Sequence, residues 1–220
     1  MTGTLALVGG DAFSEGCTFD VALLAASGGT EVAVLPTAGA YEHPDRDVAA
    51  ATAWFESLGA SVRDVPVLTR PDALVAANVE AVASARFVYL CGESSMHLRS
   101  VFKDSPVWEA LVAAWQAGAV LAASSGAARV LCDPMVDPRG GAFAVGLGLI
   151  PGLAVIPHHD HWSREKAHRT IQLAPKGLPI AAVDDRTALI RDVDGTWRSE
   201  GAGEVAIFVD GAAQPLSALP

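Results

Sequence analysis

The stretch Leu121–Val130, LAASSGAARV, passes from small apolar residues into a Ser-Ser-Gly turn and then into a segment that suits a helix. A serine on a tight strand-to-helix turn projects its hydroxyl above the edge of a sheet, and small neighbours are needed because the backbone there is strained. The full G-x-S-x-G pattern is not met, since Ala122 stands at the first glycine position and Gly126 supplies the second. The pattern predicts Ser124 as a nucleophile; the alternative is a turn that only packs tightly or cradles a phosphate.

Short apolar runs on either side of this stretch indicate the sheet to which it belongs. They are apolar throughout rather than alternating, as in parallel strands covered on both faces, and they occupy Leu5–Gly10, Val32–Thr37, Phe87–Gly92 and Ala119–Ser124. Helical patterns separate them at Asp47–Leu58 and Pro106–Ala117, and Ser105 can cap the second helix. The alternation predicts an α/β fold with a doubly wound, mostly parallel sheet.

The last third of the chain has a different pattern. Short strand patterns joined by turns occupy Ile180–Asp184, Thr187–Arg191 and Glu204–Val209. They predict a short antiparallel C-terminal extension of the sheet. A length of 220 residues suits one α/β domain, so we expect residues 1–220 to form a single domain.

Composition and charge exclude several classes of partner. A net charge of −10 would repel phosphate backbones and anionic membranes, so nucleic acid and lipid surfaces are not expected partners. The three cysteines are widely spaced and the N-terminus has no basic region, so we expect a cytoplasmic protein without a signal peptide. No apolar stretch is long enough for a membrane span, and we expect no cofactor.

A histidine-rich segment, Val155–Trp162 (VIPHHDHW), is the second chemical feature. On a strand, His159 and His161 would share one face and His158 the other. One of these histidines could act as a general base for a serine. A metal site formed by the three histidines and a surface cluster without a function are the alternatives that the segment leaves open.

A polar loop follows the strand that ends near Cys91. At the carboxyl edge of a parallel sheet such a loop faces the ligand crevice, and Gly92 would let a backbone N–H approach an oxyanion. An ordinary turn into a helix is the alternative. We expect Glu93 to lie in the first turn of that helix, where the dipole favours an acid, and to point away from Ser124. Otherwise Glu93 selects a substrate with a positive group, such as a free α-amino terminus.

Taken in order, these segments resemble the peptidase E and cyanophycinase group of serine peptidases, which have a fold like that of class I glutamine amidotransferases. The resemblance covers roughly residues 5–175. It rests on Gly9-Gly10 after the first strand, the loop Leu90–His97, the turn Ser124–Ala127, and the run Gly146–Gly152 ahead of His158. Ala122, Ser125 and Glu93 depart from the family's residues at their positions.

The resemblance implies a flavodoxin-like sheet and hydrolysis of small peptides, with aspartyl peptides as the best-known substrates of the group. It implies Ser124 as the nucleophile, His158 as the base, and Asp133 as the acid, with Asp137 as second choice. It places the N–H groups of Gly92 and Ser125 in the oxyanion hole. Around them we expect substrate contacts from Glu93, Ser94 and His159.

Other functions stay open at this stage. An amidase or esterase could use the same Ser124, because acyl-transfer chemistry does not fix the leaving group. A non-catalytic protein on the same scaffold could hold an anion at Ser124 and Gly92, and His158 would then only pack. A metal-dependent hydrolase could use His158, His159 and His161. The expected partner is a small peptide substrate; a homodimer is left open.

Overall fold

The protein contains a large, mostly parallel sheet, as the strand patterns predict. The computed structural model describes residues 2–220. The parallel strands are β1 (Leu5–Val8), β2 (Glu31–Leu35), β3 (Ser61–Asp64), β4 (Phe87–Leu90) and β5 (Val120–Ser124). Two antiparallel strands, β12 (Thr187–Arg191) and β13 (Trp197–Gly201), complete the seven-stranded order β13-β12-β1-β5-β4-β2-β3. The predicted α/β fold class is confirmed.

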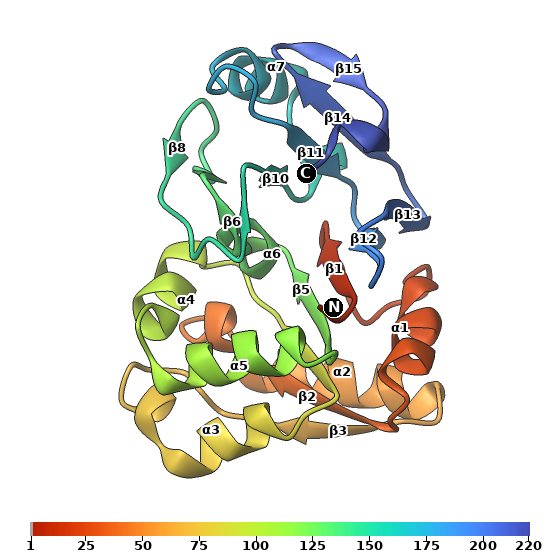
Figure 1. Cartoon of the computed structure of the whole chain (residues 1–220), viewed down its shortest axis with the longest axis vertical. Helices are drawn as coiled ribbons and strands as arrows, with labels where there is room; N and C mark the ends of the chain where they lie inside the picture. The colour runs from red at the N-terminus through yellow and green to blue at the C-terminus, as the bar shows by residue number, and fades with distance from the viewer. Residues whose placement is uncertain (1) are drawn as a thin grey trace.

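Helices cover both faces of this sheet (Figure 1). One face packs against α1 (Phe19–Ser27) and α2 (Pro44–Ser57) through a core that includes Phe19, Leu23 and Phe55. The other face packs against α3 (Ala76–Ala83), α4 (Ser95–Phe102), α5 (Pro106–Gln116) and α6 (Gly126–Leu131). The Ser105 hydroxyl accepts a hydrogen bond from the N–H of Trp108 at 3.1 Å, which confirms the predicted cap of α5.

A second sheet lies beyond the carboxyl ends of the parallel strands, at the top of Figure 1. Its strands, in order, are β10 (Ala154–Ile156), β11 (Ile180–Val183), β14 (Val205–Val209) and β15 (Ala212–Gln214). The helix α7 (Arg164–Gln172) packs on it through Ile171. The predicted antiparallel extension is correct only in part. Strands β10 and β11 are parallel, and β12 joins the main sheet because it pairs with β1.

Smaller elements connect the two sheets. Two short strand pairs follow α6: β6 (Cys132–Asp133) with β9 (Ile150–Pro151), and β7 (Met135–Val136) with β8 (Phe143–Ala144). Single 3₁₀ turns occupy Thr37–Gly39, Asp72–Leu74, His159–His161 and Leu216–Ala218. No helix within residues 2–220 has the length and apolar character to span a bilayer.

The carboxyl ends of strands from both sheets meet at one place. The N–H of His158, after β10, donates to the carbonyl of Gly9, after β1, at 3.1 Å. The N–H of Arg186, after β11, donates to the carbonyl of Gly10 at 2.8 Å. Loops that follow β1, β4, β5, β10 and β11 can therefore bring side chains together between the sheets, as at the carboxyl edge of other open α/β sheets.

Candidate active site

The strained turn predicted after β5 is present, but it is centred on Ser125. Ser125 has φ 58° and ψ −128°, a backbone conformation that non-glycine residues rarely adopt. Such strain persists where the surrounding structure imposes it, and a nucleophile on a strand-to-helix turn is a known case. Ser124 is the last residue of β5, pairs with Val8 of β1 and is 3% exposed. The strained strand-to-helix turn, called the elbow below, is therefore at Ser125, one residue beyond the predicted Ser124.

The two serine side chains face different surroundings. Successive residues of a strand point to opposite faces, so Ser124 lies on the same face as Ala122, which packs in the core under α1 and α2. Ser125 is 8% exposed, and its side chain is among the groups that lower the pKa of the Glu93 carboxylate. Of the two hydroxyl groups, the one on Ser125 lies among polar side chains at the carboxyl edge of the sheet.

The predicted oxyanion role of the Ser125 N–H is wrong. This N–H donates to the carbonyl of Val8 at 3.0 Å, so it is not free to bind a ligand. The N–H groups of Gly92 and Gly126, in contrast, donate to no protein acceptor within residues 2–220. Gly126 follows Ser125 directly, which is where a nucleophile elbow provides an oxyanion donor.

Close backbone contacts require glycine at both donor positions. A Cβ on Gly126 would lie 1.9 Å from the carbonyl oxygen of Glu93, and a Cβ on Gly92 would lie 2.1 Å from the nitrogen of Gly39. Gly92 also has φ +110°, which disfavours any side chain. The carbonyl of Gly92 accepts the N–H of Ala127 at 3.2 Å. These contacts bring the loop after β4 against the start of α6.

Behind the elbow, a buried polar pair supports α6. The Ser95 hydroxyl donates to the carbonyl of Gly126 at 2.8 Å and accepts from Nη1 of Arg129 at 3.2 Å. Arg129 is only 3% exposed, and burial lowers the pKa of its guanidinium although Glu93 and Asp137 act in the opposite direction. A buried positive charge therefore lies under the elbow.

His158 extends from the loop after β10 toward the loops after β1 and β4. It has a left-handed backbone with φ 53°. A Cβ on Gly10 would lie 1.9 Å from its Cε1 atom, so glycine at position 10 leaves room for the imidazole. Its Nδ1 lies 2.6 Å from Oδ1 of Asp185, the second residue after β11. An imidazole oriented by a carboxylate through Nδ1 is the arrangement in which Nε2 can serve as a general base.

The predicted acids do not reach His158. Oδ1 of Asp133 accepts the N–H of Gly146 at 2.9 Å and so holds the glycine-rich run in place. Asp137 pairs with Arg139 at 2.9 Å, and the hydrogen bonds from Arg139 lower the pKa of Asp137 to about 2. Asp133, as the predicted partner of the histidine, is therefore replaced by Asp185.

The carboxylate of Glu93 contacts the other ring nitrogen of His158, Nε2. Its Oε1 lies 2.5 Å from Nε2, so the imidazole is held between two carboxylates. Burial alone would lower the pKa of His158, but Glu93 and Asp185 outweigh it and raise that pKa. Burial likewise would raise the pKa of Glu93, whereas His158 and Ser125 lower it. A protonated His158 paired with an ionised Glu93 is the state that these contacts favour.

Ser94 and His159, the other two residues predicted to contact the substrate, have side-chain partners elsewhere. The Ser94 hydroxyl caps α4 by accepting the N–H of His97 at 3.4 Å. Nδ1 of His159 lies 3.3 Å from Oδ1 of Asp184. Neither Ser94 nor His159 contacts the elbow through a hydrogen bond within residues 2–220.

The three histidines do not form a joint metal site. In the described chain, the single group of three side chains whose ligand atoms lie within 4.8 Å of one another is Asp160, His161 and Asp185. Nε2 of His161 lies 3.0 Å from Oδ2 of Asp185, so this carboxylate contacts His158 with one oxygen and His161 with the other. The structure thus gives no support to metal binding by His158, His159 and His161 together.

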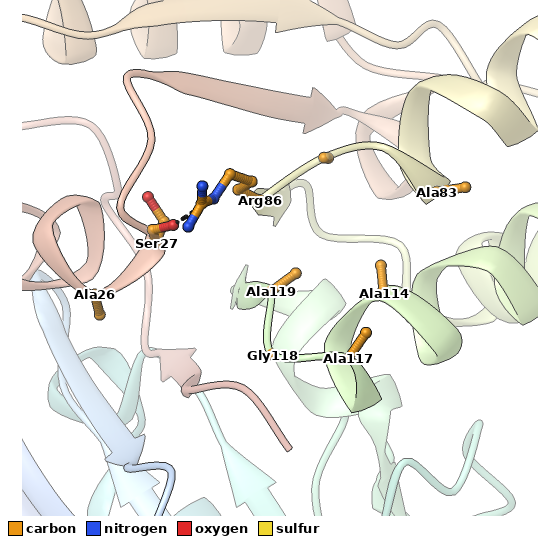
Figure 2. Close-up of a pocket in the computed structure, with 9 residues that line it drawn as sticks. Ala26, Ser27, Ala83, Arg86, Ala114, Ala117, Gly118 and Ala119 are labelled. Atoms are coloured by element: carbon orange, nitrogen blue, oxygen red, sulfur yellow. Dashed lines mark hydrogen bonds between the residues drawn. The ribbon is translucent and has the colours of Figure 1, made fainter. Parts of the chain in front are cut away.

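A hollow of about 290 Å³ lies at the opposite end of the main sheet (Figure 2). Alanines dominate its lining, and Arg86 donates from Nε to the carbonyl of Ser27 at 2.8 Å. No acid or histidine lines it. It therefore lacks the groups that acid–base chemistry needs, and the elbow remains the candidate active site.

A covered α/β sheet, a strained serine turn, and a histidine oriented by an aspartate are together typical of serine hydrolases. The model of peptidase family S51 matches residues 5–196, so the chain belongs to this family of serine peptidases. The predicted resemblance to peptidase E and cyanophycinase is thereby confirmed.

Individual relatives agree with this assignment. Cyanophycinases from Synechococcus elongatus and from Thermosynechococcus vestitus are each 25% identical over 167 residues, which is 70% of this chain and 51% of theirs. The chain thus spans about half the length of these curated relatives. A peptidase from an acI-B1 Actinobacterium has a TM-score of 0.86 and 26% identity, covering 97% of this chain and 93% of the other. A putative peptidase E from Listeria monocytogenes EGD-e, at 15% identity and a TM-score of 0.66 over 94% and 98% of the chains, shares the fold.

Sequence reasoning missed Asp185, although a signal for it existed. The run Ile180–Asp184 is predicted as a strand that ends in an acid, and Asp185 follows it directly. An acid at the carboxyl end of a strand is as well placed for a ligand crevice as the loops after β4 and β5. The interpretation of this point as a turn between two strands gave Asp185 no chemical role.

Proposed function

We propose that this protein is a serine peptidase of small peptides that forms an acyl-enzyme on Ser125. His158 acts as general base through Nε2, and Asp185 fixes its orientation through Nδ1. The observation that carries the proposal is the strained backbone of Ser125, at φ 58° and ψ −128°, on a turn packed against Glu93, whose carboxylate contacts His158. Strain of this kind is expected where a nucleophile must be presented.

The chemistry follows from these positions. The Ser125 hydroxyl attacks the scissile carbonyl, and Nε2 of His158 takes the hydroxyl proton. The N–H groups of Gly126 and Gly92 would stabilise the oxyanion, and His158 then passes the proton to the leaving amine. A water molecule, activated by the same histidine, hydrolyses the acyl-enzyme and restores Ser125.

The accessibility of the serine supports a small substrate. Ser125 is 8% exposed, so only a short, unfolded segment of chain could bring a carbonyl to it. An aspartyl dipeptidase-like specificity, or one like that of the related cyanophycinases, belongs to this proposal.

A non-catalytic protein on the same scaffold is the alternative, and the position of Glu93 favours it. A working serine–histidine pair needs Nε2 free, whereas here a carboxylate lies 2.5 Å from it. If that pair were permanent, Ser125 would have no base.

Ser125→Ala and Ser124→Ala test the proposal as a matched pair of variants. We expect Ser125→Ala to lose dipeptide hydrolysis by about 10³-fold or more, with Ser124→Ala within about tenfold of wild type. Prolonged treatment of wild type with a fluorophosphonate, followed by peptide mass mapping, should place the adduct on Ser125. An adduct on Ser124 would move the nucleophile back, and no adduct with no hydrolysis would favour the non-catalytic protein.

A further inference from the structure

Glu93 blocks the proton-transfer path that the proposed function requires. Its Oε1 lies 2.5 Å from Nε2 of His158, and Ser125 is among the groups that lower the pKa of the same carboxylate. Nε2 is therefore occupied by Glu93, and the carboxylate must leave it before His158 can take a proton from Ser125. What could draw it away has to be a cation or a hydrogen-bond donor that arrives with the substrate.

The position of the carboxylate indicates which substrate group this is. An α-amino nitrogen is separated from the carbonyl carbon of its own residue by only two bonds, of about 1.46 and 1.52 Å. When that carbonyl is attacked by Ser125, the amino nitrogen must lie within about 5 Å of the Ser125 hydroxyl, given these bonds and a near-attack contact of about 3 Å. The backbone carbonyl of Glu93 lies against Gly126, and Ser125 lowers the pKa of the Glu93 side chain, so this carboxylate is within reach of the amino nitrogen.

The electrostatics of the site favour a cation at this place. Glu93 and Asp185 both contact His158, and Asp184 and Asp160 lie in the adjacent loops, where they pair with His159 and His161. The buried Arg129 lowers the pKa of Glu93 through its charge, but it donates to Ser95 and forms no ion pair with Glu93 within residues 2–220. Glu93 is also 46% exposed in its side chain, so a small ligand can reach it.

We propose that Glu93 binds the free α-amino group of the substrate, and that this contact releases His158 to act on Ser125. The proposal rests on the proposed peptidase function and makes the enzyme one that removes or separates the first residue of a peptide. Without a substrate amine, the His158–Glu93 pair keeps the enzyme in an inactive resting state.

The proton balance of this step closes without an outside acid or base. In the resting state Nε2 of His158 carries a proton and Glu93 is ionised. A neutral α-amine accepts that proton and becomes an ammonium group paired with Glu93. His158 is left neutral, with the lone pair of Nε2 directed at Ser125. Because α-amino groups titrate near pH 7.7–8.0, a sizeable fraction of substrate is neutral at pH 7 to 8.

Glu93→Gln separates this proposal from the proposed function. The substrates are a free-amine dipeptide and its N-acetylated analogue, and the measured quantity is the ratio of their kcat/KM values. We expect wild type to prefer the free amine, and Glu93→Gln to reduce that ratio about tenfold or more through loss of a charge-assisted contact. The matched control is Glu42→Gln, which removes another exposed acid whose charge acts on Asp47 near the same edge of the sheet.

A second measurement does not need a peptide. A fluorophosphonate has no amine, so it meets wild type in the resting state, and we expect Glu93→Gln to be labelled faster on Ser125, by about tenfold or more. An unchanged kcat/KM ratio together with an unchanged labelling rate would overturn the role of Glu93 and leave the peptidase intact. A wild type that hydrolyses both substrates equally would do the same. No labelling in any variant would overturn the proposed function, and this proposal with it.

Discussion

Asp185→Asn, compared with Asp133→Asn, tests which carboxylate orients the histidine. Oδ1 of Asp185 lies 2.6 Å from Nδ1 of His158, and its side chain is 12% exposed, so water cannot readily replace its charge when the imidazolium forms. An amide at this place can hold the wrong tautomer of the imidazole, which in serine–histidine–aspartate enzymes costs about 10⁴-fold in kcat. At about 1.4 kcal/mol per tenfold, that loss corresponds to about 5.5 kcal/mol of transition-state stabilisation.

Glu93 does not compensate for this loss. During turnover it has left Nε2 and pairs with the substrate's ammonium group, so the charge of Asp185 on the imidazolium is not replaced. We therefore expect a decrease in kcat of about 10³- to 10⁴-fold. Asp133→Asn should change kcat by less than about threefold, because an amide oxygen at position 133 can still accept the N–H of Gly146.

The assay is steady-state hydrolysis of a dipeptide, with thermal unfolding of each variant as the control for folding. Asp185 also contacts His161, so His161→Ala is the control for the loss of that contact. The His161 side chain is 67% exposed, and we expect its removal to change kcat little. A variant Asp133→Asn that is as inactive as Asp185→Asn, while both unfold at the wild-type temperature, would refute the assignment of Asp185.

Two further predictions concern pH. Glu93 and Asp185 outweigh burial and raise the pKa of His158, so kcat/KM of wild type should rise with pH through a pKa above 6.5. In Glu93→Gln this rise should occur at lower pH. A rise at the same pH in both proteins would contradict the pairing of Glu93 with His158. Burial raises the pKa of Asp20 to about 7, against the hydrogen bond from Trp54, so its contribution to stability is complete below about pH 3.8 and is lost as pH rises through 7. The loss is at most about 4 kcal/mol in the free energy of unfolding. Urea titrations at pH 5 and pH 8 should show a smaller decrease in this free energy for Asp20→Asn than for wild type. The same decrease in both proteins would contradict the role of Asp20.

The fold was predictable because its signals are local. Buried parallel strands are apolar along their whole length, and the runs that begin at Leu5, Phe87 and Ala119 became β1, β4 and β5. The cap at Ser105 depends on residues three positions apart and was equally visible. The pairing of β12 with β1 was not, because it joins residues at opposite ends of the chain and no local pattern encodes such a partner.

The difference of one residue between the predicted nucleophile, Ser124, and the strained residue, Ser125, has a specific cause. The prediction aligned Gly126 with the second glycine of G-x-S-x-G, which placed the serine two residues earlier. In the structure, glycine is required at position 126 because the carbonyl of Glu93 lies against it, and the residue with the strained backbone is Ser125. A glycine can be required by a close contact as well as by its own φ angle, and the sequence does not distinguish the two.

Glu93 shows what a local explanation leaves out. The expectation was that the helix dipole accounts for an acid in the first turn of α4. The helix begins at Ser95 and Ser94 is its cap, so Glu93 precedes both, and its carboxylate contacts His158, a residue of the other sheet. The dipole therefore does not explain it. An ionised carboxylate beside an oxyanion site opposes the reaction unless a cation neutralises it during turnover. In the resting enzyme that cation is His158, which must itself become neutral to act as a base. Arg129 acts on Glu93 from a distance but makes no ion pair with it, so a substrate ammonium group can take the place of His158, and Glu93 is the residue from which the substrate's free amine is inferred.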